Sequence, residues 1–160
     1  MLQSIFFKKN KPEWLGFSII ELLVVVSIIS ILFGVAMPSY LSSVQKSKVT
    51  SMIASAEIVK QEVFNQYLRN NGQFVAFSNS DQNISTNLVS SVVVSLFNSV
   101  NIIKINSVSG AIASGAVVTI ALVPSASNTA GGSLNWTCKS NGYSQFCPSD
   151  CQAVCATGEC

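Results

Sequence analysis

The chain has 160 residues, of which 49% are hydrophobic and only 10% charged, and its net charge at neutral pH is +2. This length suits about one domain, but the composition is too apolar for a plain soluble domain, so part of the surface must be buried in lipid or in a subunit interface. Without residues 1–16 the chain keeps six basic and six acidic side chains, and this balance excludes strong nonspecific binding to nucleic acid.

The first two elements are a basic segment, residues 1–16, and an apolar segment, residues 17–38. Three lysines lie in the first, and basic residues hold such a segment on the cytoplasmic side of a membrane. The second is as long as the roughly 20 apolar residues that cross a bilayer. A cleaved secretory signal and an uncleaved anchor are alternatives, although the run is longer than a signal core and more helix follows Pro38 instead of a small-residue cleavage site.

One carboxylate, Glu21, lies inside the apolar segment. A charge in hydrocarbon is costly, so such residues are usually paired and functional. A glutamate at the level of the lipid headgroups, close to the helix start, is the alternative interpretation. Pro38 predicts a bend or a loosened turn beginning near Gly34, because proline removes a helical hydrogen bond and clashes with the carbonyl four residues before it.

Residues 39–71 continue the helix with a different composition. An apolar stripe at helical spacing predicts one face packed on a sheet; its members are Leu41, Val44, Met52, Ala56, Val59, Val63 and Tyr67. Lys48 is expected to bridge the widest gap in the stripe with its aliphatic stem. Gly72 suits a left-handed cap that ends the helix. A coiled coil is the alternative, but the segment lacks sustained heptads.

Residues 72–99 contain a polar loop and a connecting segment, and residues 100–139 are expected to form an antiparallel sheet. Runs rich in β-branched residues predict strands at 100–108, 116–123 and 133–139. The run 89–97 fits either a strand or a short helix. The predicted fold class is therefore α+β, with a long N-terminal helix, apolar in its first half and amphipathic in its second, packed on a small antiparallel sheet.

Five cysteines lie between Cys138 and Cys160, so at least one thiol is left unpaired or pairs between subunits. Zinc is an alternative to disulfides, but the chain has no histidine and no CxxC pair. The absence of histidine and of nucleophile or phosphate-binding motifs also argues against an enzyme. We expect no catalytic residues, no cofactor and no metal site.

The order Gly16, Phe17, then Glu21 as the fifth residue counted from Phe17, then an apolar run to Pro38, resembles the N-terminal signature of the type IV pilins, in particular the type IVa-like major pilins. The resemblance implies that residues 1–16 are a leader, that a prepilin peptidase cuts after Gly16, and that the new terminal Phe17 is N-methylated. It also implies that Glu21 pairs with this amine between neighbouring subunits, and that the helix near Pro38 melts during assembly.

A second block, residues 131–138, reads Gly-Gly-Ser-Leu-Asn-Trp-Thr-Cys and resembles the pilin strand that begins the C-terminal disulfide loop. Pro148, three residues before Cys151, continues the likeness. The resemblance implies a Cys138–Cys151 disulfide in a cysteine-rich region, residues 138–160. One further bond is expected among Cys147, Cys155 and Cys160, with its partners left open.

The implied function is that of a structural subunit of a type IV pilus, used for adhesion and twitching motility, with DNA uptake as a further activity. The implied partners are other pilins in a helical filament, the prepilin peptidase, the inner-membrane assembly machinery, lipid before assembly, and surfaces or host cells. The precursor is expected in the inner membrane and the filament at the cell surface.

Two other functions remain as alternatives. A type II secretion pseudopilin shares the N-terminal features but does not need the disulfide loop. A minor pilin acting as an adhesin or DNA receptor is the other alternative. Lys104 and Lys139 are the only basic residues beyond the helix, so nucleic acid is a weakly supported partner.

Overall fold

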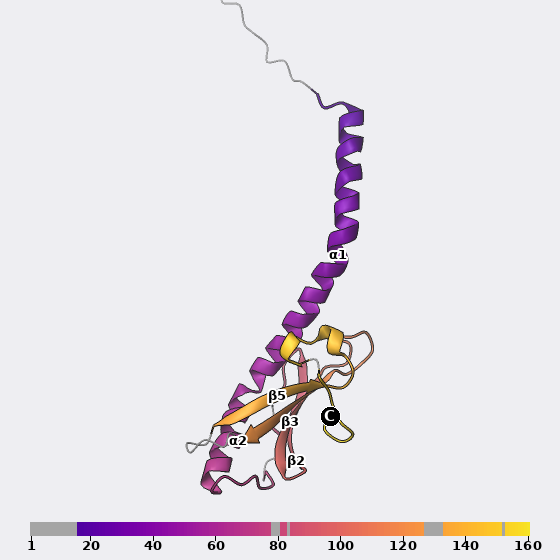
Figure 1. The fold of residues 1–160 in the computed structure, drawn as a ribbon. Coiled ribbons are helices and arrows are strands. Elements are labelled where there is room, and N and C mark those ends of the chain that lie inside the picture. The colour runs from indigo at the N-terminus through magenta and orange to yellow at the C-terminus, as the bar shows by residue number, and fades with distance from the viewer. Residues whose placement is uncertain (1–15, 78–80, 83, 127–132, 152) are drawn as a thin grey trace, which may run out of the picture. The chain divides into compact units, whose positions relative to one another are not determined.

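A computed structural model describes residues 16–77, 81–82, 84–126, 133–151 and 153–160 (Figure 1). It divides into two compact units, Met1–Ser39 and Tyr40–Cys160. Helix α1, Ile19–Ser55, contributes to both. Each unit is described by itself below, and the second is called the head.

The described part of the first unit is helical from Ile19 onward. The helix continues through Gly34 and Pro38, where the sequence predicts a weak turn. Every residue from Gly16 to Leu41 is exposed within the chain. The apolar segment therefore forms a helix that no other part of the described chain covers.

The head begins with the rest of α1 and with α2, Glu57–Arg69. The sequence predicts uninterrupted helix to Asn70, and this is wrong at Ala56, where the N–H donates to the Ile53 carbonyl at 3.1 Å in a tighter turn. The predicted cap at Gly72 is present: its φ is +78° and its N–H donates to the Tyr67 carbonyl at 2.9 Å.

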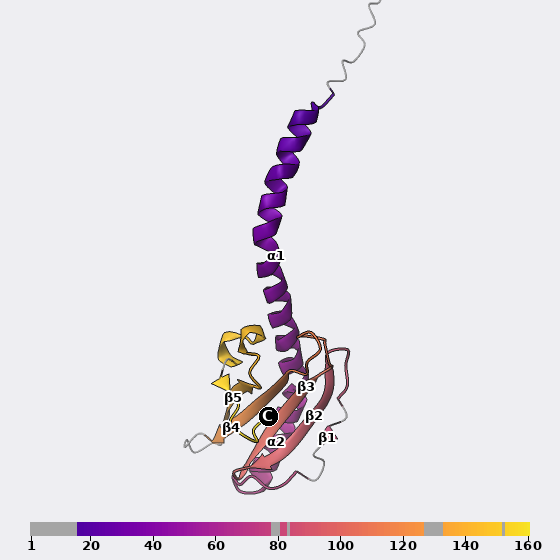
Figure 2. The same cartoon turned by 90° about the vertical axis from the view of Figure 1, so that its right-hand side faces the viewer.

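The sheet of the head has six strands among the described residues, in the order β1 to β6 (Figure 2). All neighbours are antiparallel except β5 and β6, which are parallel. The strands are β1 Asp81–Gln82, β2 Val89–Phe97, β3 Val100–Ser107, β4 Thr119–Ala126, β5 Leu134–Ser140 and β6 Ala153–Val154. Two short 3-10 helices, Ser144–Phe146 and Ser149–Cys151, follow β5.

Two strand predictions need correction or completion. The undecided run 89–97 is a strand, so the sheet extends beyond the expected range 100–139. The strand predicted at 116–123 begins at Thr119 and continues through Pro124 to Ala126. The ladder between β3 and β4 ends at Leu122, so β4 has one ladder neighbour at Pro124, where a missing N–H is tolerated. The expected turn at Gly131 and Gly132 lies outside the described residues.

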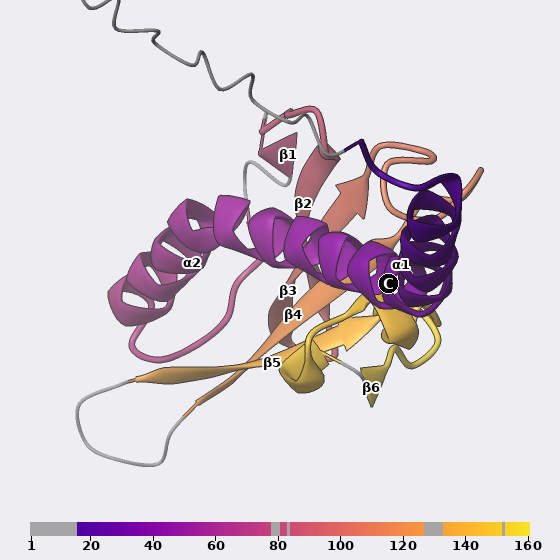
Figure 3. The same cartoon turned by 90° about the horizontal axis from the view of Figure 1, so that it is seen from above.

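The core of the head lies between the helices and one face of the sheet, which we call the helix face (Figure 3). Of the predicted stripe, Met52, Ala56, Val59 and Val63 are buried, whereas Leu41 is exposed. The gap assigned to Lys48 is filled by Val49, which is fully buried. Alternate strand residues complete this core, among them Val92, Val94, Ile103, Ile105, Ile120 and Leu122. The α+β architecture predicted from the sequence is thus confirmed.

Candidate functional site

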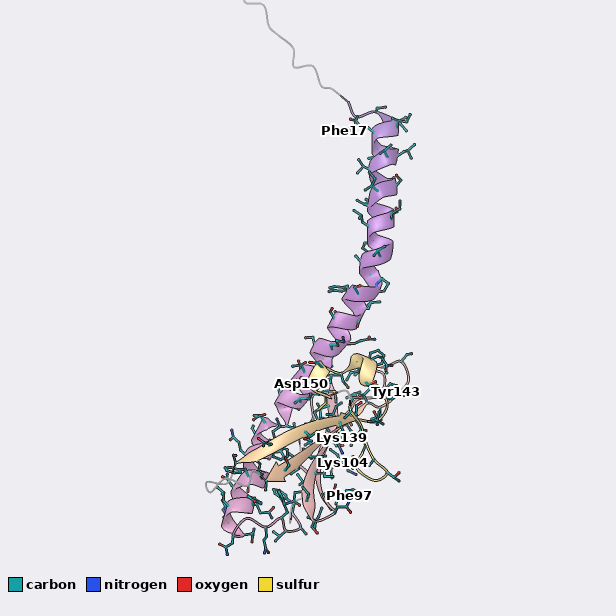
Figure 4. All side chains as sticks on the ribbon, viewed as in Figure 1. Phe17, Phe97, Lys104, Lys139, Tyr143 and Asp150 are labelled. Carbon is teal, nitrogen blue, oxygen red and sulfur yellow. A yellow bond between two sulfur atoms is a disulfide. The ribbon has the colours of Figure 1, made fainter. Side chains whose placement is uncertain are left out.

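The apolar segment presents a large hydrophobic surface. Its leading residue, Phe17, is 83% exposed (Figure 4). The helical stretch Ile19–Arg69 contains an 18-residue window with a mean hydropathy of 2.8, and by length and composition it can cross a membrane. Such exposure is unfavourable in water, at about 25 cal/mol for each Å² of apolar surface. This surface therefore requires lipid or other subunits around it.

Polar groups in the segment are of two kinds. The hydroxyls of Ser27 and Ser30 donate to the helix carbonyls of Val24 and Val26, each at 2.7 Å, so their hydrogen bonds are made without water. Glu21 lies in the first turn of α1. Neither of the two salt bridges among the described residues includes it. Glu21 is thus a charge in this segment that has no salt-bridge partner among the described residues.

The junction between Gly16 and Phe17 lies just before α1. Both residues are exposed and outside regular secondary structure, and no atom lies within 4 Å of where a Cβ at Gly16 would be. An enzyme that cleaves this bond would therefore meet no steric obstacle from the described chain. Residues 1–15, which carry the leader lysines, lie outside the described residues.

Two disulfides close the C-terminal region. Cys138 on β5 is bonded to Cys151, and Cys155 is bonded to Cys160. Cys147 is a free, fully buried thiol whose Sγ donates to the Tyr143 carbonyl at 3.5 Å. Burial raises the pKa of this thiol, an effect that a hydrogen bond with Ser140 partly offsets. The odd cysteine is therefore not positioned to pair with another subunit.

Three lysines of the head, Lys48, Lys104 and Lys139, are held by neighbouring groups. Lys48 donates to the Ala111 carbonyl at 2.8 Å, and Lys104 donates to the Gly158 carbonyl at 3.0 Å. Lys139 binds both carboxylate oxygens of Glu159, at 2.7 and 2.8 Å. The hydrogen bond from Lys139, followed by one from the backbone, lowers the pKa of the Glu159 carboxyl. These contacts engage Lys104 and Lys139, the two lysines that lie beyond the helices.

Asn101 is a positioning residue that the sequence analysis missed. It is 1% exposed, and its Nδ2 donates to the Val75 carbonyl at 2.9 Å and to Gln66 Oε1 at 3.3 Å. These bonds fix the loop that follows α2 against β3. The sequence did contain a signal: Asn101 is a single amide between apolar neighbours in a run rich in β-branched residues. An amide buried in such a strand is normally hydrogen-bonded, so it indicates a specific partner.

A shallow groove of about 270 Å³ lies between α2 and β5, with Phe64, Leu134 and Trp136 in its lining. No group of metal-ligating side chains occurs among the residues that the structure describes. The groove therefore combines these apolar side chains with the Lys60–Glu57 ion pair, which also lines it.

Comparison with known proteins decides the family. The sequence model of the family described as pilin, a bacterial filament protein, matches residues 45–152. The chain belongs to the pilin family. This pilin is also 32% identical over 142 residues to the fimbrial protein EcpC of Eikenella corrodens, an alignment that covers 86% of the chain and 90% of the relative. No solved structure matches the chain.

Membership assigns this pilin to a family of filament subunits and not to enzymes. The assembled form is a surface filament built with other pilins. The family match ends at residue 152, so β6 and the Cys155–Cys160 disulfide lie beyond it. The C-terminal ring is therefore a feature of this chain that the family model does not cover.

Proposed function

We propose that the chain is the precursor of a type IV pilus subunit. In this proposal residues 1–16 are a leader that a prepilin peptidase removes, and Phe17 becomes the methylated N-terminus. Residues 17–38 hold the subunit in the inner membrane and then become part of the filament centre. The head, residues 40–160, forms the filament surface, with the loop of residues 72–88 as its variable region.

The observation that carries the proposal is Glu21 in the exposed apolar part of α1 with no salt-bridge partner among the described residues. Cleavage after Gly16 would create a positive amine on Phe17, about one helical turn from Glu21. A carboxylate and an amine that share an apolar environment attract each other far more strongly than they do in water. Pairing between neighbouring subunits would draw each new subunit into the correct axial register.

Assembly would also cover the exposed apolar surface. In lipid, acyl chains surround Ile19 to Leu41; in the filament, the same residues of neighbouring subunits would replace them. Pro38 cannot donate a helical hydrogen bond, so the carbonyl of Gly34 lacks its usual partner and a local unwinding near Pro38 breaks one hydrogen bond fewer. The proposed role of Pro38 is therefore to permit such a change during assembly.

The charge-pairing role is tested with Glu21→Ala. We expect this variant to insert into the membrane normally, because the change makes the segment more apolar, while the amount of sheared surface filament falls at least about tenfold, as the loss of a buried ion pair predicts. Immunoblots of membrane and sheared fractions measure both quantities. Ser30→Ala removes a polar group without a charge and is the matched control, expected to assemble normally. Normal filament yield from Glu21→Ala would refute the pairing role.

Processing is tested separately by the intact mass of the protein sheared from cells. A mass that begins at methylated Phe17 supports the complete proposal. A membrane form that still begins at Met1, together with no protein in the sheared fraction, would refute it. A processed form confined to the cell envelope would instead favour the type II secretion pseudopilin.

Adhesion and twitching motility are the activities that we propose for the filament, with surfaces or host cells as targets. DNA uptake, and a minor pilin that acts as a DNA receptor, have less support, because Lys104 and Lys139 are both engaged within the head. Deletion of the gene with scoring of attachment, surface translocation and transformation would separate these activities. Loss of transformation alone would favour the DNA receptor.

A further inference from the structure

The outer face of the sheet, opposite the helix face, is divided into a polar and an apolar part. At one end Thr119 Oγ1 donates to Asn106 Oδ1 at 2.9 Å, and Asn106 Nδ2 donates to Ser91 Oγ at 3.1 Å. These three polar side chains form a row that suits contact with water. At the other end lie Ile102 and Ala121, which alternation places on the outer face. Both are buried, at 1% and 0% exposure, although neither belongs to the main core. Something other than the helices must cover them.

The cover is the C-terminal segment, residues 153–160, which we call the clasp. Its glycine, Gly158, has a φ of +90°, and a Cβ there would lie 2.9 Å from the Phe97 ring, so the backbone lies directly against that side chain. Lys104 donates to the Gly158 carbonyl, and Lys139 holds Glu159. Figure 4 shows Phe97, Lys104 and Lys139 following one another across the sheet. The clasp thus lies over the part of the outer face that contains Phe97 and Lys104, and Cys160 Sγ lies 3.9 Å from the Thr119 carbonyl oxygen.

The clasp reaches this face by passing round the edge of β5. Ala153 and Val154 pair with Lys139 and Ser140, and the Cys155 N–H donates to the Ser140 carbonyl at 3.0 Å. Cys138 points to the helix face, where Cys151 is buried in the main core. The two disulfides therefore lie on opposite faces of the sheet, and β6 covers an edge that would otherwise expose unpaired backbone groups.

The disulfides also differ in accessibility. Cys155 and Cys160 are both partly exposed, whereas in the core disulfide only Cys138 is partly exposed and Cys151 is fully buried. The rate of thiol–disulfide exchange depends on access to the sulfur that is attacked. A thiol in solution can therefore reach both sulfurs of the clasp disulfide but only one sulfur of the core disulfide.

We propose that the Cys155–Cys160 ring is a redox-opened clasp, closed over the outer face while its disulfide is intact and released from the sheet when a small-molecule dithiol reduces it. The dithiol transfers two electrons and two protons: its thiols become a cyclic disulfide, and the Cys155–Cys160 bond becomes two thiols. The remaining contacts are the two-residue pairing of β6 with β5, the bonds from Lys104 and Lys139, and the contact of Gly158 with the Phe97 ring. We expect them not to offset the conformational freedom that the tail regains. In an oxidising extracellular medium the clasp stays closed.

Release would uncover Ile102 and Ala121 and the edge of β5 at Lys139 and Ser140. Both surfaces are suited to association with another chain, one by apolar contact and one by strand pairing. The head keeps its helix-face core in this process, because the Cys138–Cys151 disulfide and the helices are not part of the clasp.

The experiment uses the full-length oxidised protein in detergent micelles, treated with dithiothreitol and then alkylated at timed intervals. Peptide masses identify which cysteines have been reduced. We expect Cys155 and Cys160 to be labelled at least about tenfold faster than Cys138 and Cys151, as their exposure implies. Equal rates for the two pairs would overturn the proposal.

Hydrogen exchange tests release directly. In Cys155→Ser/Cys160→Ser, without any reductant, amides of residues 153–160 should exchange at least about tenfold faster than in the oxidised wild type, while those of β3 keep their protection. Unchanged protection of 153–160 would show that the noncovalent contacts alone hold the clasp and would overturn the proposal. Loss of protection in β3 as well would overturn it equally, because opening would then unfold the head.

Discussion

The Cys138–Cys151 disulfide allows a quantitative test of how the head is stabilised. The perturbation is Cys138→Ala/Cys151→Ala, which removes the bond without adding a buried polar group. The bond closes a chain segment with a sequence separation of 13 residues. In the chain-entropy treatment a loop of this size contributes about 3 kcal/mol at 25 °C. The loss of sulfur packing at the buried Cys151 adds to this value.

The clasp disulfide is the matched comparison. Its sequence separation is 5 residues, for which the same treatment gives about 2 kcal/mol. Much of that contribution concerns only a tail on the outer face, so Cys155→Ser/Cys160→Ser should lower the global free energy of unfolding by less than this amount. The two double variants should therefore differ clearly in their free energy of unfolding. Cys138→Ala/Cys151→Ala, the core variant, should be less stable than Cys155→Ser/Cys160→Ser, the clasp variant.

Urea unfolding followed by the fluorescence of Trp136 measures both variants. Trp136 lies on β5, two residues from Cys138, and packs against the core, and the other tryptophan, Trp14, lies before the apolar segment. A loss below about 1 kcal/mol for the core variant would refute the reasoning, since loop entropy alone predicts three times more. A larger loss for the clasp variant would refute the division of roles between the two bonds.

Three further predictions concern the head. Met52→Ala, at a fully buried position, should lower the free energy of unfolding by about 2 to 5 kcal/mol in urea titrations because it leaves a cavity. Cys147, whose pKa burial raises, should resist alkylation in the native protein at about pH 8.5, where exposed thiols react, and should react once urea unfolds the head. Lys139 lowers the pKa of the Glu159 carboxyl. The stabilisation that the ionised carboxyl gives is therefore present above the ordinary carboxyl pKa and is lost as the pH falls through the lowered pKa. In urea titrations across this pH range, the free energy of unfolding should fall less steeply with pH for Glu159→Gln than for the wild type.

The N-terminal half could be predicted from the sequence because its determinants are local. A membrane-length apolar run, the single charge at Glu21 and the glycine at position 16 need no tertiary contact to be interpreted. The helical period of Met52, Ala56, Val59 and Val63 likewise identified the buried face. The interruption at Ala56 could not be foreseen, because alanine favours helix and nothing in the local sequence predicts a turn there.

The sheet was harder to predict because its determinants are nonlocal. The run 89–97 carries no clean alternation, since a β-bulge between Val89 and Ser91 shifts the pattern by one residue. The hairpin signal was Asn98 and Ser99, whose φ angles of 48° and 63° form a two-residue turn. Recognition of this turn would have identified β2 as the partner of β3.

The cysteine region shows a similar limit. Because the number of cysteines is odd, at least one thiol stays unpaired within the chain. Which of Cys147, Cys155 and Cys160 stays unpaired depends on the face of the sheet that each one reaches. Cys147 lies in the helix-face core, whereas Cys155 follows β6 round the edge of the sheet. Only the pairing of β6 with β5 brings Cys155 and Cys160 together on the outer face. The spacing of the cysteines carries no information about this passage of the chain from the helix face to the outer face.

The burial pattern along α1 separates the folding of the head from assembly. Among the described residues none before Val49 is buried, so the segment from Phe17 to Leu41 adds nothing to the core of the head. Its apolar character therefore has no role in the folding of this chain alone, and it is explained only by an environment that other molecules provide. Lipid and neighbouring pilins are two such environments. If Glu21 pairs with the amine of Phe17 in a neighbouring subunit, as we propose, only the second environment neutralises its charge. A subunit held in the membrane would then gain free energy when it enters the filament.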